Sequence, residues 1–305
     1  MEQLFGSLPG AVSLGLIWGI MAIGLYITYK ILAISDLTVD GSICTGAAVC
    51  TMLITMNEMD PWLAMLCAMG AGALSGLVTG LLHTLLDIPA ILSGILTQMM
   101  LWSINLKIMG QANRPISSRR FPVIIKQMDP EGAITMLVII TVGIIALLYW
   151  FFGTARGCSI RATGCNIHMS RAQGINTEIN KVLGLMLSNA LVALSGALLA
   201  QYQGYADINM GRGAIVIGLA AIVIGEVLFS RIARNFAVRL FTVALGGVIY
   251  YVVYQVIVFL GLDTDLLKML SAVVVAVFLG VPNIKNKLFA KLKFKKAVKE
   301  GSANA

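Results

Sequence analysis

The sequence predicts an all-α fold, that of a polytopic membrane protein with about nine transmembrane helices. Of its 305 residues, 58% are hydrophobic and only 12% are charged, and the mean hydropathy is +0.89. A soluble domain carries about 25% charged residues. The second observation is that the apolar residues fall into windows of about 20 residues, the length that crosses a bilayer. Together they exclude an ordinary soluble domain.

The apolar windows give the order of the expected helices along the chain. Polar or charged residues separate them, and the count of nine stands within a range of eight to ten. The windows lie near residues 11–28, 37–56, 62–82, 89–106, 135–152, 179–200, 213–229, 238–260 and 265–281. We therefore expect a transmembrane domain over 1–282, followed by a basic tail over 283–305.

The distribution of basic residues predicts the orientation. Seven lysines lie in the last 21 residues, and basic segments next to membrane helices stay in the cytoplasm. The C-terminus is therefore expected inside, and an odd number of helices places the N-terminus outside. Much of the net charge of +8 comes from this tail, and its expected neighbours are anionic lipid head groups. No nucleic-acid partner is therefore expected.

The longest polar interruption of the chain is residues 153–177, GTARGCSIRATGCNIHMSRAQGINT. It carries Arg156, Arg161 and Arg171, and it is therefore expected to face the cytoplasm. A cytoplasmic partner is expected to dock on it.

A short helix is predicted inside this loop. Asn166 can cap it through its side-chain oxygen, and Gly174 can end it about two turns later with a left-handed backbone. Thr177 is expected to cap the apolar segment that follows. A short helix lying across a loop of a membrane protein is a contact surface.

An inverted repeat is also expected. The segment DGSICTGAAV at 40–49 aligns without gaps on DINMGRGAIV at 207–216, with Asp, Gly, Ala and Val in common. The two segments begin helices that would cross the membrane in opposite senses, a layout that builds a central path from two related halves. Coincidence between helices rich in Gly and Ala is the alternative.

Polar residues inside the apolar windows are candidates for the lining of a path, because such groups are costly in lipid unless they face a cavity or a partner helix. Asp40 and Asp207 rank first because each stands at the Gly-containing start of a repeated helix. Interhelical hydrogen bonds, or N-capping for the two aspartates, are the alternative roles. The full set is Asp40, Ser42, Gln98, Asn105, Asn189, Ser195, Gln201, Asp207 and Asn209.

Three glycines at intervals of four, Gly72, Gly76 and Gly80, predict a close approach between the third helix and a neighbour. Other combinations predict no chemistry. Cys158, Cys165 and His168 lack the spacing of a zinc site, so no metal is expected. The sequence contains no GxxxxGK[ST], HExxH or GxSxG motif, so no enzyme activity is expected of this chain.

Four motifs carry a family resemblance. They are LTVDGS at 37–42, RATGCN at 161–166 with AQGI at 172–175, the segment from SNA at 188–190 to QYQG at 201–204, and GLAAIVIGE at 218–226. Their combination resembles the permease subunits of ABC importers of the branched-chain amino-acid and ribose type, in the subgroup linked with tryptophan and tyrosine uptake. Two positions depart from the family pattern, because Cys165 and Ile167 replace an acidic residue and a proline.

The resemblance implies an inverted-repeat permease fold in a bacterial inner membrane and a set of partners. Two cytoplasmic ATPase subunits would use ATP and magnesium, so this chain would bind no cofactor. A second permease copy would complete the path, and an extracellular or lipid-anchored binding protein would deliver the solute, an amino acid, with aromatic amino acids included. The residues implied in ATPase docking are Arg161, Thr163, Gly164, Asn166, His168, Arg171, Ala172, Gly174 and Ile175.

Two other functions remain open at this point. An ion-coupled secondary transporter would use Asp40 or Glu226 to couple the movement of a proton or sodium ion to that of the solute. This function does not explain the basic, helix-containing loop. An ABC importer for sugars or nucleosides fits the same motifs. An intramembrane enzyme would need a nucleophile with its base, or a metal set, and the sequence offers neither.

Overall fold

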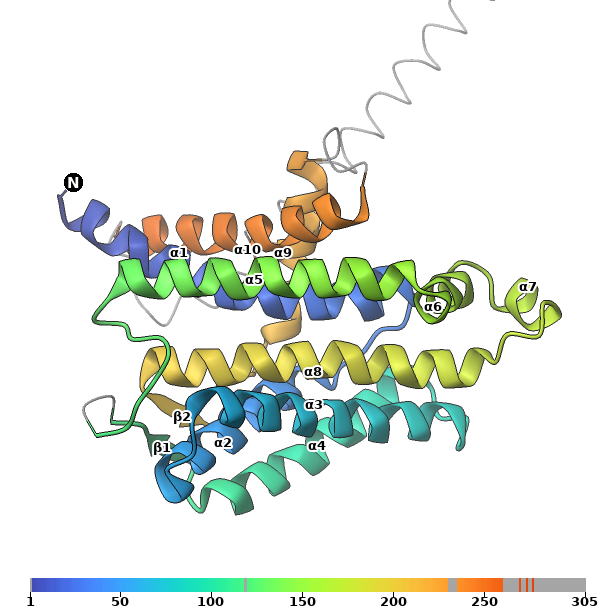
Figure 1. The fold of residues 1–305 in the computed structure, drawn as a ribbon, viewed down its shortest axis with the longest axis horizontal. Helices are drawn as coiled ribbons and strands as arrows, with labels where there is room; N and C mark the ends of the chain where they lie inside the picture. Colours follow the sequence, from blue (N-terminus) through green and yellow to red (C-terminus); the bar gives the residue numbers. More distant parts are fainter. Residues whose placement is uncertain are drawn as a thin grey trace, which may run out of the picture.

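The computed structural model describes residues 2–117, 120–229 and 235–259, together with positions 269, 273 and 276. In this part of the chain a helical bundle carries one short two-stranded sheet (Figure 1). The elements are α1 (Glu2–Tyr26), the π-helical turn η1 (Ile27–Ile31), α2 (Val39–Asn57), α3 (Pro61–Thr84), α4 (Ala90–Met109), β1 (Asn113–Pro115), α5 (Pro130–Gly153), α6 (Ala155–Cys165), α7 (Ile167–Ala172), α8 (Thr177–Gln203), β2 (Tyr205–Asp207), α9 (Ala214–Phe229) and α10 (Phe236–Phe259).

The predicted all-α membrane fold is confirmed. Seven helices of the described residues are long and apolar enough to span a bilayer, namely α1 with η1, α2, α3, α4, α5, α8 and α10. The window at 213–229 corresponds to α9, which is apolar but only 16 residues long. It lies steeply across α5 and α8 in Figure 1. The expected helix at 265–281 and the tail at 283–305 fall outside the described residues, the three positions between 269 and 276 excepted.

Local chemistry explains where several helices begin. Asp60 and Asp129 each precede a proline at the first helical position, where the missing N–H costs no hydrogen bond. Their side chains accept hydrogen bonds from the backbone N–H groups of Trp62 and Gly132. Such caps satisfy donors that the helix itself leaves free.

Helix α8 is the centre of the bundle, and α1, α2 and α3 pack around it. The glycine row of α3 makes the close approach that the sequence predicts. A Cβ added at Gly72 or Gly76 would meet the α8 backbone, and one at Gly80 would meet Val182. Small residues bring helices together in this way where lipid gives no hydrophobic driving force.

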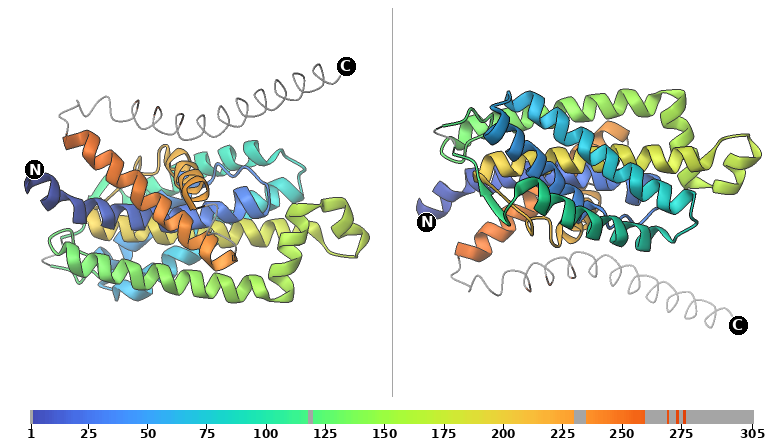
Figure 2. Two further views of the ribbon diagram at one scale, coloured as in Figure 1. Left: turned by 90° about the horizontal axis from the view of Figure 1, so that it is seen from above. Right: turned by 90° about the horizontal axis from the view of Figure 1, so that it is seen from below.

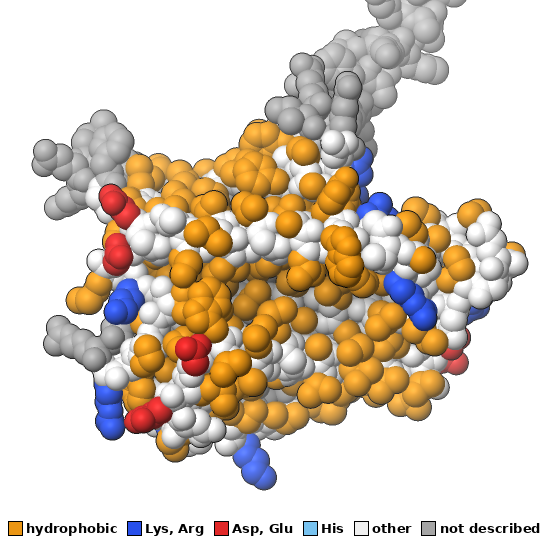
Figure 3. Space-filling model, viewed as in Figure 1, with side chains coloured by type: hydrophobic (Ala, Val, Ile, Leu, Met, Phe, Trp, Pro, Cys, Tyr) orange, Lys and Arg blue, Asp and Glu red, His pale blue; other side chains and the backbone are white. Residues whose placement is uncertain are grey.

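The two ends of the bundle differ. Helices α6 and α7 extend from one end, and β1 pairs antiparallel with β2 at the other (Figure 1). Figure 2 shows α10 lying obliquely over α1 on one face, with α3 and α4 on the opposite face. Hydrophobic side chains cover the middle of the face in Figure 3, and most charged ones lie toward its ends. This distribution is that of a multi-pass membrane protein.

Helices α2 and α9 progress along the bundle in opposite directions, as the inverted repeat predicts. Helix α2 runs in the same direction as α8, because Ser42 bonds Asn189 and Cys50 bonds Gln201. Helix α8 runs antiparallel to α1, because Ser188 bonds Gly24 and Ser195 bonds Ile17. Helix α9 runs toward the end of α1, because Glu226 near its own end pairs with Lys30. The gapless alignment of the two segments is wrong, however. Asp40 lies in the first turn of α2, but Asp207 ends β2, seven residues before α9 begins.

Candidate functional site

The predicted short helix in the loop is confirmed as α7. Asn166 has an extended backbone, and its side-chain oxygen accepts a hydrogen bond from Met169 N at 3.0 Å. Gly174 has φ +75°, in the left-handed region that glycine adopts without strain. A second helix, α6, precedes α7 and is capped by Thr154, whose hydroxyl accepts a hydrogen bond from Gly157 N. The loop is therefore an ordered helical pair.

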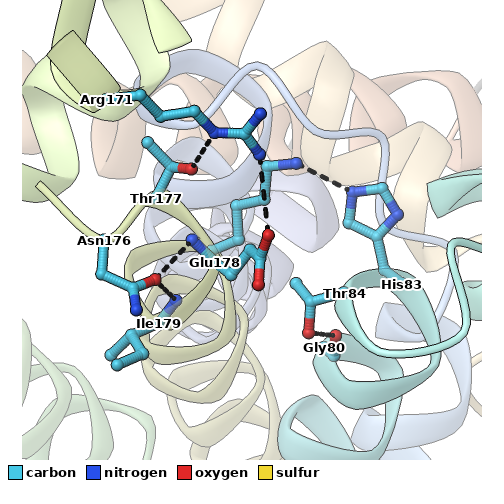
Figure 4. Close-up of polar contacts among 9 residues, drawn as sticks. Gly80, His83, Thr84, Arg171, Asn176, Thr177, Glu178 and Ile179 are labelled. Atoms are coloured by element: carbon cyan, nitrogen blue, oxygen red, sulfur yellow. Dashed lines mark hydrogen bonds and ion pairs between the residues drawn. The ribbon is translucent and has the colours of Figure 1, made fainter. Parts of the chain in front are cut away.

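Arg171 ties α7 to the start of α8 (Figure 4). Its Nε donates to Thr177 Oγ1 at 3.0 Å, and one terminal nitrogen lies 3.7 Å from Glu178 Oε1. The prediction that Thr177 caps α8 is wrong. Asn176 is the cap, because its extended backbone lets its side-chain oxygen accept from the N–H groups of Glu178 and Ile179.

The residues assigned to docking divide into an exposed and an inward group. Asn166, His168, Arg171, Ala172 and Gly174 are exposed, and Ile175 is half-buried. Sequence reasoning missed Met169, whose side chain is 55% exposed on the same short helix. The exposed part of α7 therefore combines an apolar thioether with cationic and amide groups.

The inward group holds the helical pair against the bundle. The Arg161 guanidinium lies 4.5 Å from the Phe236 ring centroid and 5.3 Å from that of Phe152, as in cation–π contacts. Thr163 Oγ1 accepts a hydrogen bond from Asn180 Nδ2 of α8 at 2.9 Å. A Cβ added at Gly164 would meet the backbone of Ile31. These residues join the loop to the spans instead of facing outward.

Two residues predicted in the path, Ser42 and Asn189, lie in a closed hydrogen-bond network. Asn189 Nδ2 donates to Asp36 Oδ2 at 2.7 Å, and Asn189 Oδ1 accepts from Ser42 Oγ at 2.6 Å. Ser42 also bonds Ser75 Oγ at 2.7 Å, and Asp36 accepts from Thr38 N at 2.9 Å. All five residues are buried. Sequence reasoning missed Asp36, which brings the segment between η1 and α2 into the bundle.

Four other residues predicted in the path lie in different parts of the fold. Gln201 is buried, accepts from Ile124 N at 3.0 Å and donates to Cys50 Sγ at 3.4 Å, so it connects α8 with α2 and with the segment before α5. Asp207 and Asn209 line a cavity of about 700 Å³ beside the tyrosines of α10. Asp207 Oδ1 also accepts from Asn209 N at 2.7 Å. Another buried residue, Ser195, donates to Ile17 O at 2.7 Å.

Asp40 and Gln98 meet at a second cavity, of about 400 Å³, between α2, α4 and the segment that leads into α9. We call it the α2–α4 cavity. It contains both acidic and basic groups, several amides and an aromatic side chain. Its lining residues are Asp40, Gly41, Cys44, Gln98, Met99, Trp102, Ser103, Asn105, Ile208 and Arg212.

The Asp40 carboxylate is fixed in place by the start of α9. Its Oδ2 accepts from Gly213 N and its Oδ1 from Ile215 N, both at 3.0 Å. A carboxylate at a helix N-terminus is favoured by the free N–H groups and the helix dipole. The N-capping alternative thus applies to Asp40, but it caps α9 from α2. Asp40 therefore couples the two helices of the predicted repeat.

These sites consist of hydrogen-bonding, charged and aromatic side chains. Among the described residues, no three His, Cys, Asp or Glu side chains are grouped so that they could hold a metal ion. The spans enclose buried polar groups, a charged cavity and an ordered helical pair at one end. Together these features fit a membrane subunit that transports a solute.

The chain belongs to the family of permease components of branched-chain amino acid transport systems, whose model matches residues 8–281. Members of this family are membrane subunits of transport systems. The family resemblance of the sequence motifs is thereby confirmed.

Several proteins with known descriptions are similar to this chain. It is 39% identical over 272 residues to a tyrosine transport system permease protein of Clostridioides difficile (strain R20291). The matched residues cover 88% of this chain and 89% of the relative. It is 33% identical over 267 residues to an uncharacterised protein of Rickettsia prowazekii (strain Madrid E), covering 87% and 93%. An autoinducer 2 import system permease protein of Yersinia pseudotuberculosis is 29% identical over 194 residues, covering 61% and 53%.

Proposed function

We propose that the chain is the transmembrane permease of an ATP-driven importer for an amino acid, with an aromatic amino acid as the expected solute. The observation that carries the proposal is the 39% identity, over 88% of the chain, to a permease described as part of a tyrosine transport system. A binding protein outside the membrane delivers the solute, and ATP hydrolysis takes place in separate subunits. The permease lies in a bacterial inner membrane among anionic lipids.

The exposed surface of α7 is the proposed docking site of the ATPase subunits. In this proposal the basic loop lies in the cytoplasm and the sheet of β1 and β2 lies outside, with the N-terminus outside and the tail inside. Because Arg161, Thr163 and Gly164 hold α6 against the spans, a push on α7 moves α6 and the adjoining part of α8 as one body. Rigid-body motion of this kind shifts a transporter between outward and inward openings.

The α2–α4 cavity lines the proposed path. Its wall on α4 includes the exposed residues Trp102 and Ser103, and Arg212 is exposed at its rim. Charged and polar groups at this depth are costly against lipid, so this face is expected to border water or protein. A second copy of the permease, packed over this face, would enclose a path between the two.

Reconstitution tests the proposal. The permease, its ATPase and its binding protein are placed in liposomes, and uptake of labelled tyrosine, leucine, ribose and adenosine is measured with ATP inside or outside. We expect uptake of tyrosine that requires both ATP on the ATPase side and the binding protein. Uptake by the permease alone, driven by a proton or sodium gradient, would reject the importer in favour of a secondary transporter.

Gly174→Val is expected to weaken ATPase docking while leaving the membrane subunit inserted. A β-branched residue in the left-handed region costs about 1–3 kcal/mol, and Gly174 has open space around it, so the strain is in the backbone. Gly174→Asn is the matched control, because asparagine tolerates this conformation. Co-purification of the ATPase and ATP-driven uptake are measured for both variants. Equal co-purification of the Val and Asn variants would contradict the docking assignment.

A further inference from the structure

We propose that the α2–α4 cavity is a binding site for a free zwitterionic amino acid, with Arg212 facing the carboxylate, Asp40 the ammonium group and Trp102 the side chain. The inference rests on the proposed function and deepens it. It assigns substrate selection to the permease itself, in addition to the binding protein.

Asn105 is the first observation. Its side chain is 0% exposed and lines the cavity, yet neither its amide nitrogen nor its amide oxygen bonds any described residue. A buried amide without partners is costly, and native proteins keep few of them. Because the amide atoms are fully buried, a shift of this side chain toward the cavity would let a ligand that supplies both an acceptor and a donor, as a free amino acid does, satisfy them.

The charges of the cavity are the second observation. Asp40 and Arg212 both line it, but the structure shows no ion pair between them. The carboxylate of Asp40 is held by backbone N–H groups on the α9 side, and a carboxylate has further lone pairs to offer a cation. Two opposite charges kept apart across one cavity match the two opposite charges of a zwitterion. A simple anion would leave the Asp40 carboxylate without an opposite charge, and a neutral sugar would leave both groups without one.

The apolar part of the wall is the third observation. Trp102, 46% exposed, and Met99 stand beside Gln98 and Ser103 on the same side of α4. Indole rings stack on aromatic side chains, and methionine adapts to their edges. A volume of about 400 Å³ is within the range of pockets that enclose small organic ligands. These features favour an aromatic amino acid over a small one.

Binding to the permease in complex with its ATPase, in nanodiscs and without the binding protein, tests the assignment. The probes are tyrosine, tyramine, which lacks the carboxylate, and 3-(4-hydroxyphenyl)propionate, which lacks the ammonium group. We expect the wild type to bind tyrosine best. Arg212→Gln should weaken tyrosine binding about tenfold to a hundredfold, the effect of losing a charged hydrogen bond, and leave tyramine binding unchanged. Lys107→Gln, which removes a charge at the end of α4 outside the cavity, should change neither.

Asn105→Leu provides a second variant that does not depend on charge. It removes an unpaired amide, so thermal stability should be equal or higher, while tyrosine binding falls about fivefold or more. Loss of stability with unchanged binding would overturn the site, as would a wild type that binds none of the probes or an Arg212→Gln effect equal for tyrosine and tyramine. ATP-driven tyrosine uptake together with any of these three results would reject the cavity but keep the importer. Absence of such uptake would reject the importer itself.

Discussion

Gly76→Val is expected to prevent stable folding of the permease. A side chain at this position meets the backbone of Leu185 and Met186 in α8. Backbone atoms cannot move aside as a flexible side chain can, so α3 must separate from α8 along its length. Overpacking costs about 1–3 kcal/mol even where side chains can adjust, and the loss here should reach the upper end of that range or exceed it.

The control for this variant is Gly70→Val on the same helix, where an added side chain finds open space. This change should alter stability by about 0.5 kcal/mol or less, as surface substitutions do. Size-exclusion profiles and thermal unfolding in detergent measure both proteins. Equal yields and equal melting temperatures for the two variants would show that the contact between α3 and α8 does not support the fold.

The elements that could be predicted from the sequence are those set by neighbouring residues. The apolar windows located the described spans because each span is defined by the length and hydropathy of its own residues. The short helix α7 followed from Asn166 and Gly174, whose side-chain cap and left-handed backbone are local properties. Thr177 was wrongly preferred over Asn176 because both residue types cap helices, and only the backbone angles distinguish them.

The parts that could not be predicted depend on contacts between distant residues. Asp36 stands just before the apolar window at 37–56, and nothing nearby in the sequence shows that Asn189, 153 positions away, is its partner. Arg161 reads as a loop cation until Phe236 is placed against it. The α2–α4 cavity likewise needs Arg212 and Asn105 from separate elements. Pairings of this kind decide which polar residue is structural and which faces a solute.

The Asp36–Asn189 pair allows this distinction to be tested for a residue predicted in the path. Asn189→Leu removes the amide that bonds the buried Asp36 carboxylate at 2.7 Å and leaves it only its bond to Thr38, and Asp36→Leu leaves the Asn189 amide nitrogen without this acceptor. Leaving a buried hydrogen-bonding group without its partner costs about 1–3 kcal/mol, and more where the group is charged. Each single variant should therefore melt at a much lower temperature than the wild type.

The double variant, Asp36→Leu with Asn189→Leu, should be more stable than the sum of the two single losses predicts. Replacing both partners with apolar groups removes the carboxylate and the amide that the single changes leave without each other. The losses that remain are those of Thr38 N and Ser42 Oγ, which each bond one of the two replaced side chains. Thermal unfolding of all four proteins gives the coupling energy, and ATP-driven uptake gives the second measurement. If uptake recovers together with stability, Asn189 is a structural residue and the path lies at the α2–α4 cavity. If stability recovers and uptake does not, Asn189 serves transport directly, and additive losses of stability would show that the two residues do not depend on each other.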